Sequence, residues 1–225
     1  MGIAKRVPNL LHRTRKVMRM SGTAQENWDR KWARADFAPP WLNRGVSREI
    51  IQAVEDGWFE PGARALDIGC GQGEVALWLA QRGFPTVGID IAPAASARAT
   101  KLADSTVGVS FQVLDIRNTA PEGKFSVLVD RGCLHQIRPQ FHAQYAANVA
   151  RACDAGARFL LLARAFRNGI EFGDLADRNR VIGYVCAALD SSFSIDRVEA
   201  TFLDGCDGKD VQRALPGMAF WMTRR

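Results

Sequence analysis

The sequence lacks any apolar run of the roughly 18 residues that a membrane-spanning helix needs. Its 5 cysteines include no C-x-x-C pair, so neither a zinc site nor a disulfide framework is indicated. An odd number of thiols fits a reducing compartment. We therefore expect a cytoplasmic protein without a membrane span, and 225 residues suit one domain with a sizeable core.

The body of the chain also lacks net charge, although the whole sequence carries +6. Residues 1–22 contain six basic side chains and no acid: Lys5, Arg6, Arg13, Arg15, Lys16 and Arg19. Without those six, 24 of the 30 Lys and Arg residues remain, against 24 Asp and Glu residues. The body shows no sign of the basic surface that nucleic-acid binding requires, so the sequence does not favour a nucleic-acid partner.

Residues 3–20 place apolar side chains at helical spacing on this basic segment. Three interpretations remain open: a lid over an active site, an anchor to an anionic surface, and a solvated arm. A cleaved organelle-targeting segment has the same Arg-rich, acid-free composition.

Residues 64–90 predict a parallel βαβ unit. The first strand covers residues 65–68, a helical pattern covers residues 75–82, and a second apolar run ends on Asp90. Short apolar runs on both sides of a helical pattern, with a short crossover, are typical of this unit.

The turn after the first strand contains Gly69, Gly71 and Gly73, which let a ligand approach the backbone at a helix N-terminus. A dinucleotide fingerprint would need glycine at position 74, where Glu74 stands. Asp67, at the end of the strand, would also repel a pyrophosphate. A cofactor that carries positive charge fits better.

The run Leu-Asp-Ile-Gly-Cys-Gly-Gln-Gly at residues 66–73 resembles the first motif of class I, Rossmann-like S-adenosylmethionine-dependent methyltransferases. The resemblance implies S-adenosylmethionine as cofactor and S-adenosylhomocysteine as product. It also implies an α/β fold, a seven-stranded, mostly parallel, doubly wound sheet in the order 3-2-1-4-5-7-6, with the last strand antiparallel. We expect basic and Trp-rich N-terminal lid helices over residues 1–45 and the methyltransferase domain over residues 46–225.

Further elements follow from periodicity and turn residues. We predict helices at residues 48–56, with Ser47 as cap, and at 92–103, 139–153 and 174–189, and strands at 109–114, 125–129, 157–163, 194–202 and 219–223. Four strands then end at acids: Asp67, Asp90, Asp115 and Asp130. Because ligands of open parallel sheets bind beyond the carboxyl ends of the strands, we expect these acids along one edge.

Asp90 lies 17 residues past Gly73, close to the roughly 20-residue offset at which an acid accepts ribose hydroxyls. We expect Asp67 and the amides of the three glycines to hold the methionine part of the cofactor. By resemblance to the family, Asp115 would take the adenine amino group, with Ile91 against the adenine face and Ile116 as an apolar or backbone contact. For each of these residues a helix cap or a core position is the alternative.

The segment after the fourth strand, Asp-Arg-Gly-Cys-Leu-His at residues 130–135, resembles many small-molecule methyltransferases. The Asn-Pro-Pro-Tyr tetrad, usual in enzymes that methylate base amino groups, is absent. We select Asp130 and His135 as candidate catalytic residues, since an imidazole suits general-base work on a hydroxyl. Alternatively, His135 holds the loop or the carboxyl end of the cofactor. Asp130 and Arg131 are also candidate cofactor contacts, and Arg131 could instead pair with Asp130 or bind an acidic substrate.

Trp28 and Trp32 lie four residues apart, on one face of a predicted helix. They either pack that helix on the body or form an aromatic wall over the cofactor and substrate. The Trp-x-x-Lys-Trp pattern is similar to the N-terminal region of thiopurine methyltransferase and its tellurite-resistance relatives. The glycine pattern of residues 69–73 departs from the thiopurine enzymes.

The main functional hypothesis is in-line methyl transfer to an oxygen, nitrogen or sulfur atom of a small molecule, by a monomer or homodimer. Alignment and exclusion of water can supply most of the rate, because the methyl group is already activated. We predict no metal, since no further acid-rich motif follows the fourth strand. Two alternatives remain: an RNA or protein methyltransferase that docks through its basic arm, and a cofactor-binding partner subunit without activity.

Overall fold

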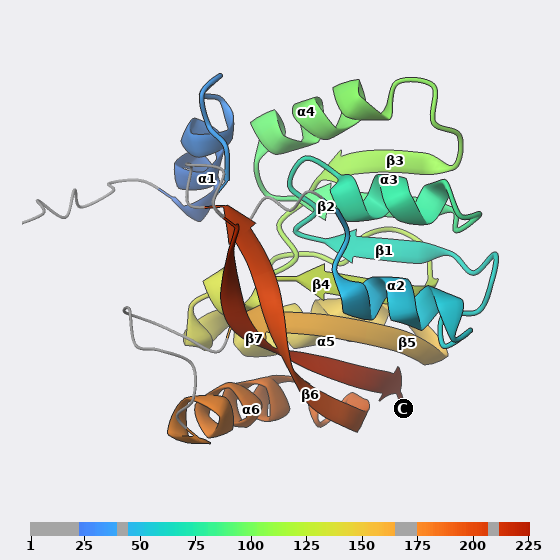
Figure 1. The fold of residues 1–225 in the computed structure, drawn as a ribbon, viewed down its shortest axis with the longest axis vertical. Helices are drawn as coiled ribbons and strands as arrows, with labels where there is room; N and C mark the ends of the chain where they lie inside the picture. Colours follow the sequence, from blue (N-terminus) through green and yellow to red (C-terminus); the bar gives the residue numbers. More distant parts are fainter. Residues whose placement is uncertain (1–22, 40–44, 165–174, 207–211) are drawn as a thin grey trace, which may run out of the picture.

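The computed structural model describes residues 23–39, 45–164, 175–206 and 212–225 (Figure 1). The predicted basic helix at residues 3–20, with its three interpretations, lies outside the described residues. The division between a cap and a methyltransferase domain at residue 45 remains a prediction.

Seven strands form one sheet in the order β3-β2-β1-β4-β5-β7-β6 (Figure 1). They are β1 Ala65–Ile68, β2 Thr86–Asp90, β3 Val109–Val113, β4 Phe125–Arg131, β5 Cys153–Arg164, β6 Phe193–Cys206 and β7 Gln212–Arg224. Strands β1 to β5 pair in parallel, and β7 runs antiparallel between β5 and β6. The predicted strand order and the antiparallel last strand are confirmed.

Helices cover both faces of the sheet (Figure 1). They are α1 Ala24–Trp32, α2 Arg48–Glu55, α3 Glu74–Ala80, α4 Pro93–Ala103, α5 His142–Ala152 and α6 Leu175–Leu189, with 3-10 turns η1 Leu134–Gln136 and η2 Pro139–Phe141. None of the helices in the described ranges is long and apolar enough to span a membrane.

Two hydrophobic cores lie on opposite faces of the sheet, because successive strand side chains point to opposite sides. In β5, Leu160 and Leu162 pack with α2 and α3, whereas Phe159 and Leu161 pack with α5 and α6. The central strands are therefore buried on both faces, which explains why their sequences are nearly continuous apolar runs.

The predicted role of Ser47 as the cap of α2 is wrong. The serine occupies the N-cap position, but its side chain makes no capping hydrogen bond. Its hydroxyl instead accepts a hydrogen bond from Arg131 Nε at 2.8 Å. Ser47 therefore bonds to a residue that is distant in the sequence instead of to the first turn of α2.

The final hairpin is longer than the predicted strands at residues 194–202 and 219–223. Strands β6 and β7 pair with each other as far as Cys206 and Gln212, well past the end of β5. Pairing between the two strands satisfies the backbone groups that face each other there, without a third strand. The apolar pattern of the sequence therefore marks only part of each strand.

We expect Phe159→Ala to lower the free energy of unfolding by roughly 3–5 kcal/mol, because Phe159 is fully buried and its ring lies 5.4 Å from that of Phe193. Leu102→Ala is the control, since Leu102 is 55% exposed on α4, and its effect should stay within about 0.5 kcal/mol. Urea denaturation measures both variants. Similar losses for the two would contradict the core assignment.

Candidate functional site

The loops that leave the carboxyl ends of β1 to β4 meet at one edge of the sheet. The backbone amide of Leu114, just after β3, donates to the carbonyl oxygen of Asp90 at 2.9 Å, so the ends of β2 and β3 are adjacent. The four predicted acids belong to this edge: Asp67, Asp90, Asp115 and Asp130. Their surroundings differ strongly, however.

The glycine-rich turn between β1 and α3 depends on left-handed backbone conformations. Gly69, Gly71 and Gly73 have φ values of 71°, 55° and 84°. Side chains are rarely tolerated there, which explains the three glycines. The amide of Gly71 donates to Asp90 Oδ2 at 3.0 Å, so the turn is fastened to the end of β2.

The indole of Trp32 lies directly against this turn. A Cβ atom added to Gly71 would stand 3.0 Å from the Trp32 ring. Trp32 is 4% exposed and makes an edge-to-face contact with Phe37, at 5.2 Å between ring centroids. Trp28 is half-buried beside the same small cluster, with Lys31 Nζ 3.9 Å from its ring centroid. Of these two tryptophans, Trp32 is the one that contacts the glycine turn.

Helix α1 is held over this edge by contacts with α4. Asp29 Oδ1 accepts a hydrogen bond of 2.7 Å from the amide of Ala94, in the first turn of α4. Arg98 donates to the carbonyl oxygens of Arg34 and Phe37. Because Ala92 offers α4 no side-chain cap, Asp29 supplies one from another helix.

Asp67 is 2% exposed and accepts a hydrogen bond from the amide of Ala76 at 3.1 Å. It therefore caps α3, whose N-cap residue, Gly73, has no side chain to do so. Burial raises the pKa of Asp67 to about 7, and the nearby charges of Asp130 and Asp90 act in the same direction. A cation bound nearby would favour the ionised form of Asp67 and so lower this pKa.

Asp90 is 9% exposed and joins two loops. Its Oδ2 accepts from Gly71 and its Oδ1 accepts from the amide of Ala92 at 2.9 Å. Burial raises its pKa, against the effect of these backbone hydrogen bonds. Each carboxylate oxygen accepts one of these two bonds. The carboxylate can therefore still accept hydrogen bonds from a diol.

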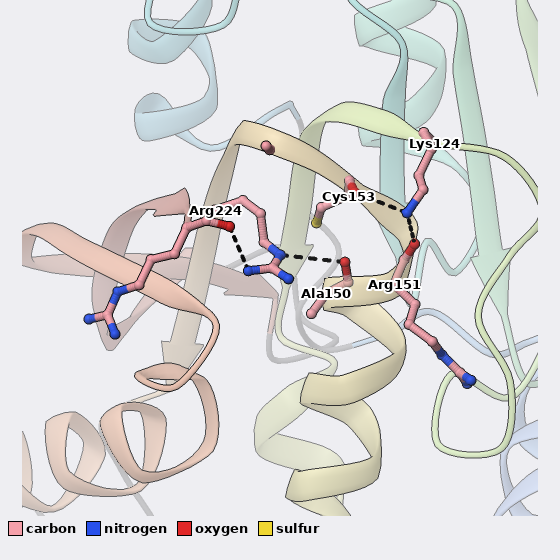
Figure 2. Close-up of a pocket in the computed structure, with 7 residues that line it drawn as sticks. Lys124, Ala150, Arg151, Cys153 and Arg224 are labelled. Carbon is pink, nitrogen blue, oxygen red and sulfur yellow. Dashed lines mark hydrogen bonds between the residues drawn. The ribbon is translucent and has the colours of Figure 1, made fainter.

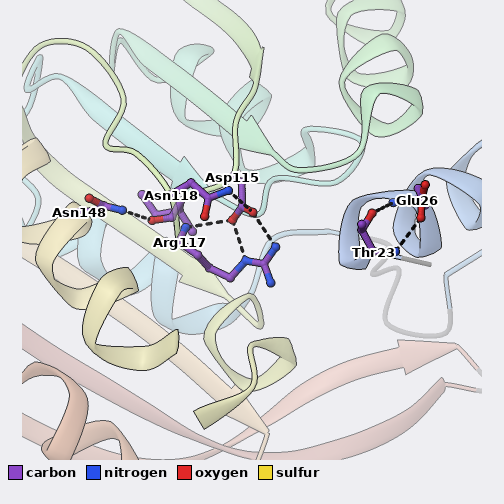
Figure 3. A network of polar contacts seen from close by, with 7 residues as sticks. Thr23, Glu26, Asp115, Arg117, Asn118 and Asn148 are labelled. Carbon is purple, nitrogen blue, oxygen red and sulfur yellow. Dashed lines mark hydrogen bonds and ion pairs between the residues drawn. The ribbon is translucent and has the colours of Figure 1, made fainter. Parts of the chain in front are cut away.

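Asp115 is engaged by its own neighbours (Figure 3). Arg117 donates from Nε to Oδ1 at 2.8 Å and from Nη2 to Oδ2 at 2.6 Å. The amide of Arg117 and the side chain of Asn118 add bonds of 3.0 and 3.1 Å. Burial acts to raise the pKa of Asp115, but the hydrogen bonds and charge of Arg117 outweigh it and lower that pKa overall.

The two predicted isoleucine contacts flank Asp90 and Asp115. Ile91 is half-buried, whereas Ile116 is 5% exposed and packs in the core on the α5 side. The carbonyl oxygen of Ile116 accepts a hydrogen bond from Asn148 at 2.6 Å (Figure 3). Ile116 therefore has a core role in addition to any contact with a ligand.

Asp130 is fully buried. Its Oδ1 accepts from the amide of Cys133 at 2.6 Å, and its Oδ2 accepts from the amide of Leu134 and the hydroxyl of Tyr145 at 3.0 and 2.5 Å. Burial raises its pKa to about 6. This geometry gives Asp130 a structural role, since it holds the turn that leads into η1. Its contact with cofactor or substrate stays a prediction.

His135 is half-buried within η1. Its Nδ1 lies 3.3 Å from the amide nitrogen of Arg164, the last residue of β5. A Cβ atom added to Gly132 would stand 2.8 Å from His135 Cε1, so the ring folds back over that glycine. Because the amide can only donate, Nδ1 accepts, and a neutral ring would carry its proton on Nε2.

Arg131, at the end of β4, points toward α2 and α3. It donates to Ser47, and its charge opposes the burial that raises the pKa values of Asp67 and Glu74. It does not pair with Asp130 in the contacts described above. A guanidinium in this position suits the carboxylate of a bound amino acid.

Sequence reasoning missed the contacts by which three residues shape the site. Tyr145 and Ser47 contact Asp130 and Arg131 across 15 and 84 positions, and no local pattern signals such pairs. Arg117 could have been found, since an Asp-x-Arg spacing allows a short-range ion pair.

A separate basic cavity of about 310 Å³ lies near the opposite ends of β4 and β5 (Figure 2). Lys124 Nζ donates to the carbonyl oxygens of Arg151 and Cys153 at 2.6 and 3.3 Å, and Arg224 Nε to that of Ala150 at 3.5 Å. These carbonyls end α5, where cations are favourable. The basic side chains thus stabilise a helix terminus, away from the glycine turn.

Comparisons with known proteins agree with this site. A family profile described as "Methyltransferase domain" matches residues 65–156, which include the glycine turn and all four acids. An uncharacterised methyltransferase of Schizosaccharomyces pombe is 34% identical over 103 residues, which make up 45% of this chain and 70% of that protein. The chain belongs to the class I S-adenosylmethionine-dependent methyltransferases.

Two further relatives have more specific names. The 2-heptyl-1-hydroxyquinolin-4(1H)-one methyltransferase of Mycobacteroides abscessus is 34% identical over 127 residues, 55% of each protein. A ubiquinone biosynthesis O-methyltransferase of Pseudomonas aeruginosa is 31% identical over 141 residues, 61% of this chain and 55% of the relative. The chain therefore spans little more than half the length of these two relatives.

Solved structures share the fold. A structure described under "Conversion of a Disulfide Bond into a Thioacetal Group during Echinomycin Biosynthesis" has a TM-score of 0.76 at 22% identity, over 89% of this chain and 92% of that one. The N-methyltransferase NodS of Bradyrhizobium japonicum, in complex with S-adenosylhomocysteine, has a TM-score of 0.62 at 17% identity, over 89% and 97%. The link to the thiopurine and tellurite-resistance branch stays a prediction.

The raised pKa of Asp67 predicts a pH-dependent stability. Between about pH 4 and pH 7 the folded protein keeps a proton on Asp67 that the unfolded chain has lost, so the free energy of unfolding falls as the pH rises. Relative to wild type, Asp67→Asn should gain roughly 1–3 kcal/mol between pH 5 and pH 8. Urea denaturation at several pH values measures this difference.

Asp36→Asn provides the control for this experiment. The hydrogen bond from Arg34 and its charge lower the pKa of Asp36, so its ionisation does not change between pH 5 and pH 8. The stability difference between this variant and wild type should be flat there. An equally flat difference for Asp67→Asn would show that Asp67 is already ionised at pH 5.

Proposed function

We propose that this protein transfers a methyl group from S-adenosylmethionine directly to a hydroxyl oxygen on the aromatic ring of a small molecule. The observation that carries the proposal is the edge of β1 and β2, where buried carboxyls face a bare glycine backbone. Cationic character in a ligand suits that edge, since burial raises the pKa values of Asp67 and Asp90 and both gain from a positive neighbour.

The arrangement suggests how the described residues would hold the cofactor. Asp67 and the amides of the glycine turn would hold the methionine part, with Arg131 at its carboxylate. Asp90 would accept hydrogen bonds from the ribose hydroxyls, because each of its oxygens has acceptor capacity beyond its backbone donor. Asp115 would take the adenine amino group, between Ile91 and Ile116.

The cofactor would supply a methyl group already activated by a sulfonium. The task of the protein is then alignment and exclusion of water. Trp32 lies on the glycine turn and shields that side, and α1 is fixed there by Asp29. For His135 to accept the proton of the acceptor hydroxyl, its unprotonated Nδ1 would have to exchange the hydrogen bond from the amide of Arg164 for one from that hydroxyl, because Nε2 carries the proton of the neutral ring.

The proposed acceptor class draws on the names of two relatives. One is a methyltransferase of a hydroxyquinolone, and the other is an O-methyltransferase of ubiquinone biosynthesis. Both names point to hydroxylated rings. The neutral body of this chain also suits an uncharged aromatic compound better than a polyanion.

Binding of S-adenosylhomocysteine tests the cofactor site. Asp90→Asn should weaken binding roughly 10- to 100-fold, because charge-assisted hydrogen bonds contribute about 1.5–3 kcal/mol. Asp190→Asn is the matched control, since Asp190 is 67% exposed and pairs only with Arg225 among the contacts described for it. Titration calorimetry gives the dissociation constants. Absence of binding by the wild-type protein at millimolar ligand would refute the cofactor assignment.

Labelled methyl transfer tests the acceptor class. The wild-type protein, incubated with methyl-labelled S-adenosylmethionine, should label phenols, catechols and N-hydroxylated heteroaromatic compounds in preference to amines and thiols of similar size. His135→Gln should lower the rate on hydroxyl acceptors by roughly 10²- to 10⁴-fold, with S-adenosylhomocysteine binding unchanged. If the labelled methyl group enters only RNA or protein, the result would instead favour an RNA or protein methyltransferase that docks through its basic arm.

A further inference from the structure

The carboxylate of Asp115 is saturated with donors from its own loop. Oδ1 accepts from the backbone amide and Nε of Arg117, and Oδ2 accepts from Nη2 of Arg117 and Nδ2 of Asn118 (Figure 3). An ionised carboxylate offers about four acceptor positions. Any further donor must therefore displace one that is already there.

The neighbouring acid behaves differently. Asp90 accepts one backbone hydrogen bond on each oxygen, from Gly71 and Ala92, and the amide of Ile91 also stabilises its charge, so the carboxylate can still accept a hydroxyl donor without displacing a partner. Of the two acids assigned to the nucleoside, only Asp115 requires an exchange. That exchange would concern the exocyclic amine of adenine and leave the ribose unaffected.

We propose that Arg117 sets the affinity for adenine by competing with its exocyclic amine for the carboxylate of Asp115. This inference rests on the proposed function, because it assigns Asp115 to the adenine. The guanidinium releases Oδ2 when the amine binds, and the backbone amide of Arg117 keeps its bond to Oδ1. The carboxylate thus stays oriented during the exchange.

The surroundings of Arg117 make the exchange feasible. The side chains of Arg117 and Asp115 are 21% and 17% exposed, so the released guanidinium reaches water. Its central carbon lies 5.2 Å from the ring centroid of Phe141, a contact that can retain the cation beside the site. Because the binding-competent state must first open, the apparent affinity is reduced by the fraction of molecules that are open.

Substitution of Arg117 tests the competition by binding alone. Arg117→Met keeps the length of the side chain and removes its donors. Its dissociation constant for S-adenosylhomocysteine should fall roughly three- to tenfold, as expected if 10–30% of wild-type molecules are open. Arg117→Lys, which keeps the charge without the two-point contact, should show a smaller gain.

A ligand without the amine separates competition from a general effect. S-inosylhomocysteine carries a carbonyl oxygen in place of the exocyclic amine, so loss of Arg117 should not improve its binding. The ratio of the two dissociation constants should therefore shift toward the adenine compound by the same three- to tenfold factor in Arg117→Met. Titration calorimetry measures both ligands with each variant.

Arg34→Met is the matched control. Arg34 also forms a two-point ion pair with an acid two residues away, Asp36, but both side chains are well exposed. It should bind both ligands as the wild type does. If wild type binds S-adenosylhomocysteine and neither Arg117 variant binds it more tightly, the competition is overturned while the proposed function stands. If wild type binds neither ligand, the proposed function fails, and this inference fails with it.

Discussion

The carboxylate of Asp90 is the contact on which the site depends. One of its oxygens holds the amide of Gly71 and the other holds that of Ala92, so it joins the glycine turn after β1 to the start of α4. Helix α4 in turn carries α1, through the bond from Ala94 to Asp29. A continuous series of hydrogen bonds thus connects the glycine turn, Asp90 and α1. Loss of the Asp90 carboxylate would loosen all three.

Features that depend on local pattern could be predicted from the sequence. The βαβ unit of residues 64–90 follows from short apolar runs around a helical stretch, and all three glycines adopt the backbone conformation that their residue type suggests. The strand order did not come from pattern at all. It came from a resemblance to a family, because periodicity does not say which strands are neighbours.

Features that depend on distant partners could not be predicted. Ser47 looks like a helix cap, but a guanidinium from the end of β4 takes its hydroxyl. The final hairpin is longer than its apolar pattern predicts, because β6 and β7 pair with each other beyond the end of β5. The bond between Tyr145 and Asp130 likewise exists only once α5 has packed against the sheet. These contacts are properties of the fold rather than of any segment.

The four acids show that position along a motif does not determine a role. Both Asp67 and Asp130 are buried, and Asp67 accepts a backbone amide on Oδ2 whereas Asp130 accepts two backbone amides and a tyrosine hydroxyl, so both hold loops in place. Asp90 bridges two loops with acceptor capacity left over, and Asp115 is occupied by a neighbouring cation. Burial and the number of available donors separate side chains that are identical in the sequence.

The contact between Trp32 and Gly71 affects how chimeras of such methyltransferases can be built. Trp32 and Ser47 precede the segment that the family profile matches, and Arg164 follows it, yet they touch the glycine turn, Arg131 and His135. A chimera that transplants residues 65–156 alone would carry all four acids but would leave behind Trp32 and the hydrogen-bond partners of Arg131 and His135. With the roles proposed above, such a graft should preserve binding of the nucleoside better than it preserves turnover.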